Sequence, residues 1–291
     1  MFEAQFHQVS YSAMLRSPVF LAISRRHGLR CEEKSIEEVS RCHQQRHFMN
    51  RAVLDIYESL DESRIPTVVS HDYVLELAKH IPKRKVNVLL DLGCYDGSMT
   101  ETVQGLSGSE VAIGLDFLRK RLVQARRMGI ETIAVDFSQS GLPIGDETVD
   151  FVFAGDLIEH LYSPDSLLEE IWRVLKRDGQ GFISTPNLGS WKCRLSLLMG
   201  YQPPFAEASS VATIGNPLIP VRPPSGHIRV MTAKALVQLL RLHKFTVLRL
   251  SYYSASRAHH ESRFSTRVTD RAVRHLRPSL LDEILVSFTK D

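Results

Sequence analysis

Short apolar runs recur along the chain, each bounded by polar or turn-forming residues. They occupy residues 86–92, 110–116, 132–137, 149–155, 179–185, 245–253 and 283–290. Runs of this length, rich in Val, Ile and Leu, are typical of strands that are buried on both faces of a sheet. The pattern therefore predicts seven strands.

Helical patterns separate several of these runs. Residues 116–129 follow the second run, and residues 163–179 precede the fifth, with Ser163 placed to cap that helix and Gly179 to end it. Alternating strands and helices predict a mostly parallel sheet with helices on both faces. The last two runs are joined by mostly polar residues with few helix signals, which predicts an antiparallel pairing at one edge of the sheet.

Three regions follow from this pattern. Residues 1–85 are mostly helical in pattern and precede the sheet, so we expect a helical N-terminal extension that could cap the substrate. Residues 86–291 form the predicted α/β domain. Within it, residues 186–230 are rich in Pro and Gly, and an irregular stretch of that length is more often a lid or substrate loop than idle chain.

The composition is that of an ordinary globular enzyme, with 43% hydrophobic residues, 24% charged residues and a net charge of +3. No apolar run is long enough to span a membrane and the start lacks a basic leader, so we expect a cytoplasmic protein. Cys31, Cys42, His43 and His47 are too widely spaced for a zinc knuckle, so no metal site is predicted.

Acidic residues stand where the predicted strands end. Asp91, Asp116 and Asp136 close the first three strands, and Asp156 follows the fourth. One such acid is commonly a helix cap. Four in series predict an acidic crevice, because ligands of open parallel sheets bind beyond the carboxyl ends of the strands.

The loop after the first strand limits what this crevice can bind. Dinucleotide sites need G-x-G-x-x-G to approach a pyrophosphate, whereas this loop offers only Gly93 and Gly97 with Tyr95 between them. Asp116 lies 19 residues past Gly97, about the offset of a ribose-binding carboxylate. Asp91 would repel a phosphate but attract an ammonium group. A ligand with a ribose, an adenine and a cationic amino-acid tail fits better than a nicotinamide dinucleotide, which leaves an oxidoreductase as a weaker alternative.

These motifs carry a family resemblance. DLGCYDG at 91–97 resembles the first motif of class I methyltransferases that use S-adenosylmethionine, and the similarity continues densely to residue 187 through GLDF, AVDF and LPIGDETVDFVFAGDLIEHL. The region from 187 to 240 resembles a bacterial and archaeal branch near the ubiquinone-biosynthesis O-methyltransferases. The resemblance implies a Rossmann-like, seven-stranded, mostly parallel sheet with an antiparallel edge strand, and S-adenosylmethionine as the cofactor.

The resemblance also implies roles for individual residues. The methionine end of the cofactor would lie against Asp91 and the backbone at Gly93 and Gly97, and the ribose hydroxyls would bind Asp116. Asp136 would accept from the adenine amino group. The remaining members of the implied cofactor site are Tyr95, Phe117, Phe137 and Asp156, with the two phenylalanines as walls for the adenine ring.

Tyr95 departs from the family, which usually has glycine at this position. A glycine is needed where the backbone takes a positive φ or where a side chain would strike the ligand. A methionine tail requires less close backbone approach than a pyrophosphate, so the phenol could point out of the loop or roof the substrate side. We expect cofactor binding to be retained, with a non-catalytic cofactor-binding protein as the alternative.

Methyl transfer needs an aligned acceptor, and a hydroxyl or amine acceptor can also need a base. His160, in the turn after the fourth strand, and His227, at the end of the long irregular stretch, are the candidates. Each also has a structural reading, in which the ring only holds its turn through a hydrogen bond.

The expected acceptor is a small molecule, and its reactive atom, oxygen, nitrogen or carbon, does not follow from the sequence; neither does the oligomeric state. Residues 257–277 hold six arginines and three histidines, which could meet an anionic or lipid-like acceptor or form a solvated loop. A tRNA methyltransferase is a weaker alternative, since residues 185–187 lack the motif of base methylation and no RNA-binding module is present.

Overall fold

The computed structural model describes residues 70–137, 141–254, 270 and 272–290. Residues 1–69 of the predicted N-terminal extension therefore lie outside the described residues, as do the cysteine–histidine grouping at 31–47 and most of the basic segment 257–277. The division of the chain at residues 85 and 86 stays a prediction. In chain order the elements are α5 (His71–Leu77), β1 (Val88–Leu92), α6 (Ser98–Ser107), β2 (Val111–Asp116), α7 (Arg119–Arg127), β3 (Glu131–Ala134), β4 (Val149–Gly155), η1 (Ile158–His160), α8 (Pro164–Val174), β5 (Leu175–Pro186), α9 (Trp191–Leu198), α10 (Ala233–Leu242), β6 (Phe245–Tyr253), η3 (Pro278–Leu280) and β7 (Glu283–Lys290).

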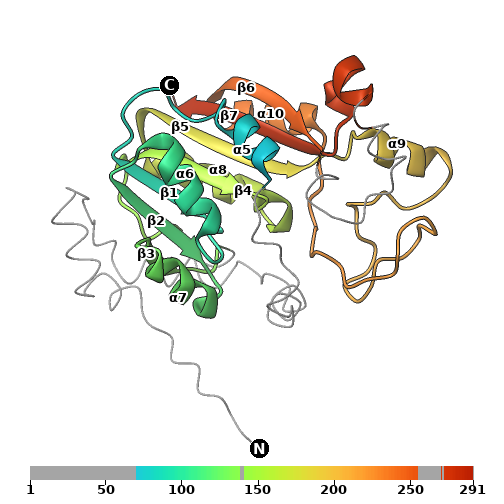
Figure 1. Cartoon of the computed structure of the whole chain (residues 1–291), viewed down its shortest axis with the longest axis horizontal. Coiled ribbons are helices and arrows are strands. Elements are labelled where there is room, and N and C mark those ends of the chain that lie inside the picture. The colour runs from blue at the N-terminus through green and yellow to red at the C-terminus, as the bar shows by residue number, and fades with distance from the viewer. Residues whose placement is uncertain (1–69, 138–140, 255–269, 271, 291) are drawn as a thin grey trace, which may run out of the picture.

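The strands form one sheet in the order β3-β2-β1-β4-β5-β7-β6 (Figure 1). β1 to β5 pair in parallel, and β7 pairs antiparallel with both β5 and β6. The seven-stranded, mostly parallel sheet and the antiparallel pairing of the last two strands are thus confirmed. Strand order reverses between β1 and β4, and ligands of such sheets bind at that point.

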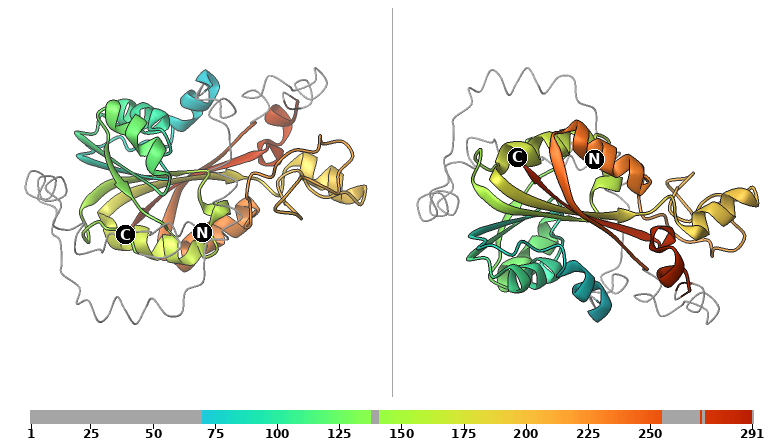
Figure 2. Two further views of the ribbon diagram at one scale, coloured as in Figure 1. Left: turned by 90° about the horizontal axis from the view of Figure 1, so that it is seen from below. Right: turned by 90° about the horizontal axis from the view of Figure 1, so that it is seen from above.

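Helices cover both faces of the sheet (Figure 2): α5, α6 and α7 lie on one face, and α8 and α10 on the other. Alternate residues of β1 show why the strand is apolar throughout. Leu89 packs into the core beneath α5, α6 and α7, whereas Leu90 packs into the core beneath α8 and α10, and both are fully buried.

Some features of the predicted pattern were wrong. The helix over 163–179 begins as expected, with the Ser163 side chain accepting from the Ser166 amide, but it ends at Val174 rather than at Gly179. Leu175 pairs with Val149 and so already belongs to β5, because sheet pairing outweighs helix propensity there. In addition, the stretch 186–230, expected to be irregular, contains α9.

The segment from α9 to residue 230 lies beyond the carboxyl ends of the parallel strands (Figure 1). It is tied to η1 by hydrogen bonds from the Ile228 and Arg229 amides to the Glu159 carbonyl, each 2.9 Å long. This is where a lid would have to lie. Among the helices that the structure describes, none is long and apolar enough to cross a membrane.

Candidate functional site

The loop between β1 and α6 is shaped by backbone angles that favour glycine. Gly93 and Gly97 have φ of +81° and +89°, and Tyr95 has φ of +49°. A Cβ on Gly97 would lie 2.8 Å from backbone and side-chain atoms of Ala125 in α7, so this glycine allows the loop to pack against α7. A Cβ on Gly93 would meet only ordinary contacts at 3.4 Å or more.

Asp116 fastens this loop to the end of β2. Its Oδ2 accepts from the Tyr95 amide at 2.9 Å, and its Oδ1 accepts from the Leu118 amide at 2.8 Å. The residue is 5% exposed, and burial raises the pKa of its carboxyl while these amide donors partly offset the rise. A carboxylate has about four acceptor positions, so two backbone bonds leave capacity for ligand hydroxyls.

Asp91 is buried near the end of β1. It is 1% exposed, and the Thr100 hydroxyl donates to its Oδ2 at 2.6 Å. The pKa of Asp91 is raised to about 7, mainly by burial. The Thr100 hydrogen bond opposes this rise, and the charge of Asp116 adds to it. A cation beside this carboxyl would restore its ionised form, so the site suits a ligand ammonium group.

The Tyr95 ring is held by α7. The Arg121 guanidinium lies over it, with Cζ 4.6 Å from the ring centroid, which is cation–π geometry. The phenol is therefore turned toward α7. The loop keeps the positive φ of a glycine position at the cost of some strain, roughly 1 kcal/mol for a left-handed residue.

The end of β3 completes the side of the crevice predicted for adenine. The Val135 amide donates to the Asp116 carbonyl at 2.9 Å, which brings Asp136 and Phe137 alongside the end of β2. Phe117 and Phe137 are both half-buried, and Phe137 packs against the core on the α8 side. The predicted cofactor residues of β1, β2 and β3 are thus gathered at one edge of the sheet.

Asp156 stands on the other side of the switch point, after β4, with φ of +48°. The Ser184 hydroxyl donates to its Oδ1 at 3.1 Å. Behind it, Glu159 is fully buried, and its Oε2 accepts from the Thr185 hydroxyl at 3.0 Å. Burial, together with the charge of Asp156, raises the pKa of Glu159 well above its usual range.

The two candidate bases meet at this end of the crevice. The rings of His160 and His227 lie 4.9 Å apart between centroids. Nδ1 of His160 donates to the Gly226 carbonyl at 3.1 Å, and Nδ1 of His227 donates to the Phe205 carbonyl at 3.3 Å. Since each Nδ1 faces a carbonyl, each Nε2 is the unprotonated nitrogen.

Burial lowers the pKa of both histidines, but their charged neighbours differ. Burial and the neighbouring His227 lower the pKa of His160 to about 3. Burial also lowers the pKa of His227, but Glu207 and Asp156 oppose that shift. Ligand atoms of Glu159, His160 and His227 lie within 4.8 Å of one another, a spacing at which the three side chains could hold a metal ion.

Glu207 holds the segment that carries His227. Its Oε2 accepts from the Gly226 amide at 2.8 Å and from the His227 amide at 3.0 Å, and its Oε1 accepts from the Ser225 amide. One carboxylate thus binds three consecutive amides. This arrangement fixes the backbone beside the His227 ring.

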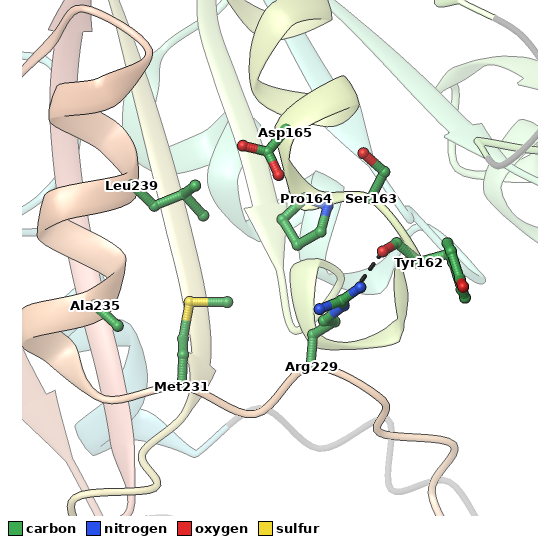
Figure 3. Close-up of a pocket in the computed structure, with 8 residues that line it drawn as sticks. All are labelled: Tyr162, Ser163, Pro164, Asp165, Arg229, Met231, Ala235 and Leu239. Carbon is green, nitrogen blue, oxygen red and sulfur yellow. Dashed lines mark hydrogen bonds between the residues drawn. The ribbon is translucent and has the colours of Figure 1, made fainter.

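A separate open pocket of about 470 Å³ lies between the start of α8 and α10 (Figure 3). The Arg229 guanidinium donates to the Tyr162 carbonyl at its rim, at 3.2 Å. None of the predicted site residues lines it. Its lining consists of Tyr162, Ser163, Pro164, Asp165, Arg229, Met231, Ala235 and Leu239.

Three residues of the crevice were missed from the sequence. Thr100 and Glu207 had no signal, because each acts on a partner that only folding brings close. Glu283 had one: it is an acid at the start of a strand that pairs antiparallel, so it begins at the edge where the parallel strands end.

Comparison with known proteins shows what the chain is similar to. A family model described as a methyltransferase domain matches residues 90–183. The ubiquinone biosynthesis O-methyltransferase of Aliivibrio fischeri (strain ATCC 700601 / ES114) is 33% identical over 121 residues, covering 40% of this chain and 50% of that protein. The mitochondrial ubiquinone biosynthesis O-methyltransferase of Bos taurus is 26% identical over 158 residues, covering 49% of this chain and 39% of that protein. The chain thus spans half or less of the length of these relatives.

Solved structures share the fold. A chain in the complex between the Haloferax volcanii Trm112 methyltransferase activator and a methyltransferase aligns with a TM-score of 0.53 at 17% identity, covering 84% of this chain and 98% of that one. An S-adenosylmethionine dependent methyltransferase from Mesorhizobium loti aligns with a TM-score of 0.51 at 16% identity, covering 76% and 98%. Residues 90–183 therefore match a methyltransferase domain, and the chain shares the fold of these solved methyltransferases.

Proposed function

We propose that the protein transfers a methyl group from S-adenosylmethionine to a small-molecule acceptor in the crevice at the carboxyl ends of β1, β2 and β4. The observation that carries this proposal is Asp116, a buried carboxylate that ties the β1–α6 loop to the end of β2 and keeps acceptor capacity. The names of the relatives favour an oxygen atom as the methyl acceptor.

The cofactor residues divide by the part of the ligand they would hold. Asp91 would pair with the ammonium group, and the loop backbone at Gly93, Tyr95 and Gly97 would pass beneath the methionine end. Asp116 would accept from the ribose hydroxyls. At the adenine, Asp136 would accept from the amino group, Phe117 and Phe137 would flank the ring, and Asp156 would close the crevice on the methyl side.

S-adenosylmethionine supplies a methyl group already activated on a sulfonium, so the chain need only orient the acceptor, exclude water and take up a proton. The residues of the crevice would hold the acceptor so that its lone pair faces the methyl group. Orientation of this kind can account for several kcal/mol of the barrier. The segment from α9 to residue 230, which hydrogen bonds to η1, would exclude water.

His227 is the stronger candidate for the base. Glu207 and Asp156 favour its protonated form, and its Nε2 is left to accept a proton. His160 has a pKa of about 3 and hydrogen bonds to Gly226, which favours a structural role for that ring.

Calorimetric titration of S-adenosylmethionine tests the proposal. We expect micromolar binding that Asp116→Ala abolishes. Asp146→Ala is the matched control, because that carboxyl is 61% exposed and pairs with Arg173 away from the crevice. Equal binding by the wild type and Asp116→Ala, or no binding by either, would contradict the assigned site. A non-catalytic binding protein would bind the cofactor but form no S-adenosylhomocysteine with any acceptor.

A further inference from the structure

A further buried acid, Glu283, begins the last strand. β7 runs antiparallel to β5, so its first residue lies beside Pro186 at the end of β5 and beside Tyr253 at the end of β6. Glu283 is 8% exposed. It therefore lies at the same edge as Asp156, displaced from the cofactor side toward β7.

Acidic side chains and side chains with hydroxyl groups surround Glu283. The charges of Asp156 and Glu159 both raise the pKa of its carboxyl, after the larger effect of burial. The Tyr73 hydroxyl donates to Ser184 Oγ at 3.4 Å, and burial and the charges of Glu283 and Asp156 raise the pKa of that phenol. Ser184 also donates to Asp156, so these groups converge on one region.

Two oxygens in this region have no donor. Glu283 Oε1 and Glu159 Oε1 are buried and have no hydrogen-bond partner among the described residues. A buried acceptor left without a donor costs about 1–3 kcal/mol, and more when it carries a charge. The nearby cation Lys192 is engaged by Asp282, at 2.5 Å from its Oδ2, and by Asp270.

We propose that Glu283, with Ser184 and Tyr73, forms the acceptor subsite and selects an acceptor that brings an N–H or O–H donor and no negative charge. This inference rests on the proposed function, since it places the acceptor beside the methyl side of the cofactor crevice. It opposes the anionic acceptor that the basic segment 257–277 had left open. Because Oε1 is enclosed, the carboxyl group has to turn toward the crevice when the acceptor enters, which its side-chain torsions allow.

Three probes of similar shape separate the possibilities. Benzylamine offers a cationic N–H donor, benzyl alcohol offers a neutral O–H donor, and benzoate is an anion without a donor. Each probe carries the same phenyl ring, so the three differ in the polar group alone. Binding is measured by ligand-observed NMR on the full chain in the presence of S-adenosylhomocysteine.

We expect benzylamine, benzyl alcohol or both to bind at least tenfold more tightly than benzoate. Glu283→Gln should weaken the preferred probe about tenfold, which lies within the usual contribution of one hydrogen bond. Preference for benzylamine would indicate an amine acceptor, and preference for benzyl alcohol a hydroxyl acceptor. Glu147→Gln is the control, since Glu147 pairs with Lys290 at the other end of β7, at 3.0 Å.

Equal or tighter binding of benzoate, no binding of any probe, or a preference that Glu283→Gln leaves intact would overturn the inference. S-adenosylmethionine is titrated into the same samples by calorimetry. The Glu283→Gln variant should bind it as the wild type does, within about twofold, which also shows that the variant is folded. Failure of the wild type to bind S-adenosylmethionine would instead refute the proposed function, independently of the probe result.

Discussion

Binding of S-adenosylmethionine should weaken as the pH falls, because Asp91 has to be ionised to pair with the ligand's ammonium group. Its pKa is about 7 in the free protein. A group with that pKa is about 90% ionised at pH 8 and about 10% ionised at pH 6. The association constant should therefore fall about tenfold between pH 8 and pH 6, measured by calorimetry at constant ionic strength.

Two variants isolate the responsible carboxyl. Asp91→Asn should bind weakly at pH 8 and show little dependence on pH, because the titrating group is gone. Thr100→Val removes the hydrogen bond that lowers the pKa of Asp91, so the midpoint of the pH dependence should move upward. A wild-type affinity that is flat from pH 8 to pH 6 would refute the reasoning, as would an equally steep dependence in Asp91→Asn.

Ionisation of Asp91 should also lower the free energy of unfolding. Its folded pKa of about 7 lies above the ordinary value of 3.8, so the ionised form destabilises the fold; the penalty is full above pH 7 and disappears as the pH falls below 3.8. A shift of about three units corresponds to an upper bound of roughly 4 kcal/mol. Asp91→Asn should thus raise the free energy of unfolding at pH 8 by about 2 kcal/mol, with a gain that shrinks toward pH 4.

Three further outcomes are expected. Gly97→Ala should lower the free energy of unfolding by about 2–3 kcal/mol in denaturant titrations, because Gly97 has a positive φ and a Cβ there would lie 2.8 Å from a backbone atom of α7. Gly105→Ala is the control: a Cβ at this position in α6 would lie in open space, so the free energy of unfolding should rise by about 0.5–1 kcal/mol. Glu207→Gln should lower the pKa of His227 in an NMR titration, since Glu207 raises it; an unchanged pKa would contradict the contact. Tyr95→Gly should keep S-adenosylmethionine affinity within about threefold, and binding gained only in that variant would show that the tyrosine closes the site.

The sheet was predictable because its strands are buried on both faces, so each appears as a continuous apolar run between turn residues. The acids at the strand ends were predictable for a related reason. Asp91 and Asp116 follow directly from strand positions, and parallel strands bring their carboxyl ends to one edge. The residues on the cofactor side of the crevice could therefore be predicted from the local sequence.

The acceptor side was not predictable in this way. Glu207 meets the 225–227 amides, and Glu283 meets Ser184 and Asp156, only through tertiary contacts between distant segments. The end of α8 at Val174 was missed for the same reason: pairing of Leu175 with a strand far away in sequence decides where the helix stops.

Titration of S-adenosylmethionine into the wild type, with Asp116→Ala and Asp146→Ala beside it, tests the central claim most directly. Micromolar binding by the wild type and Asp146→Ala, abolished in Asp116→Ala, is the predicted result. Absence of binding by the wild type, or binding that Asp116→Ala leaves intact, would contradict the claim that the crevice at the ends of β1 and β2 is the cofactor site.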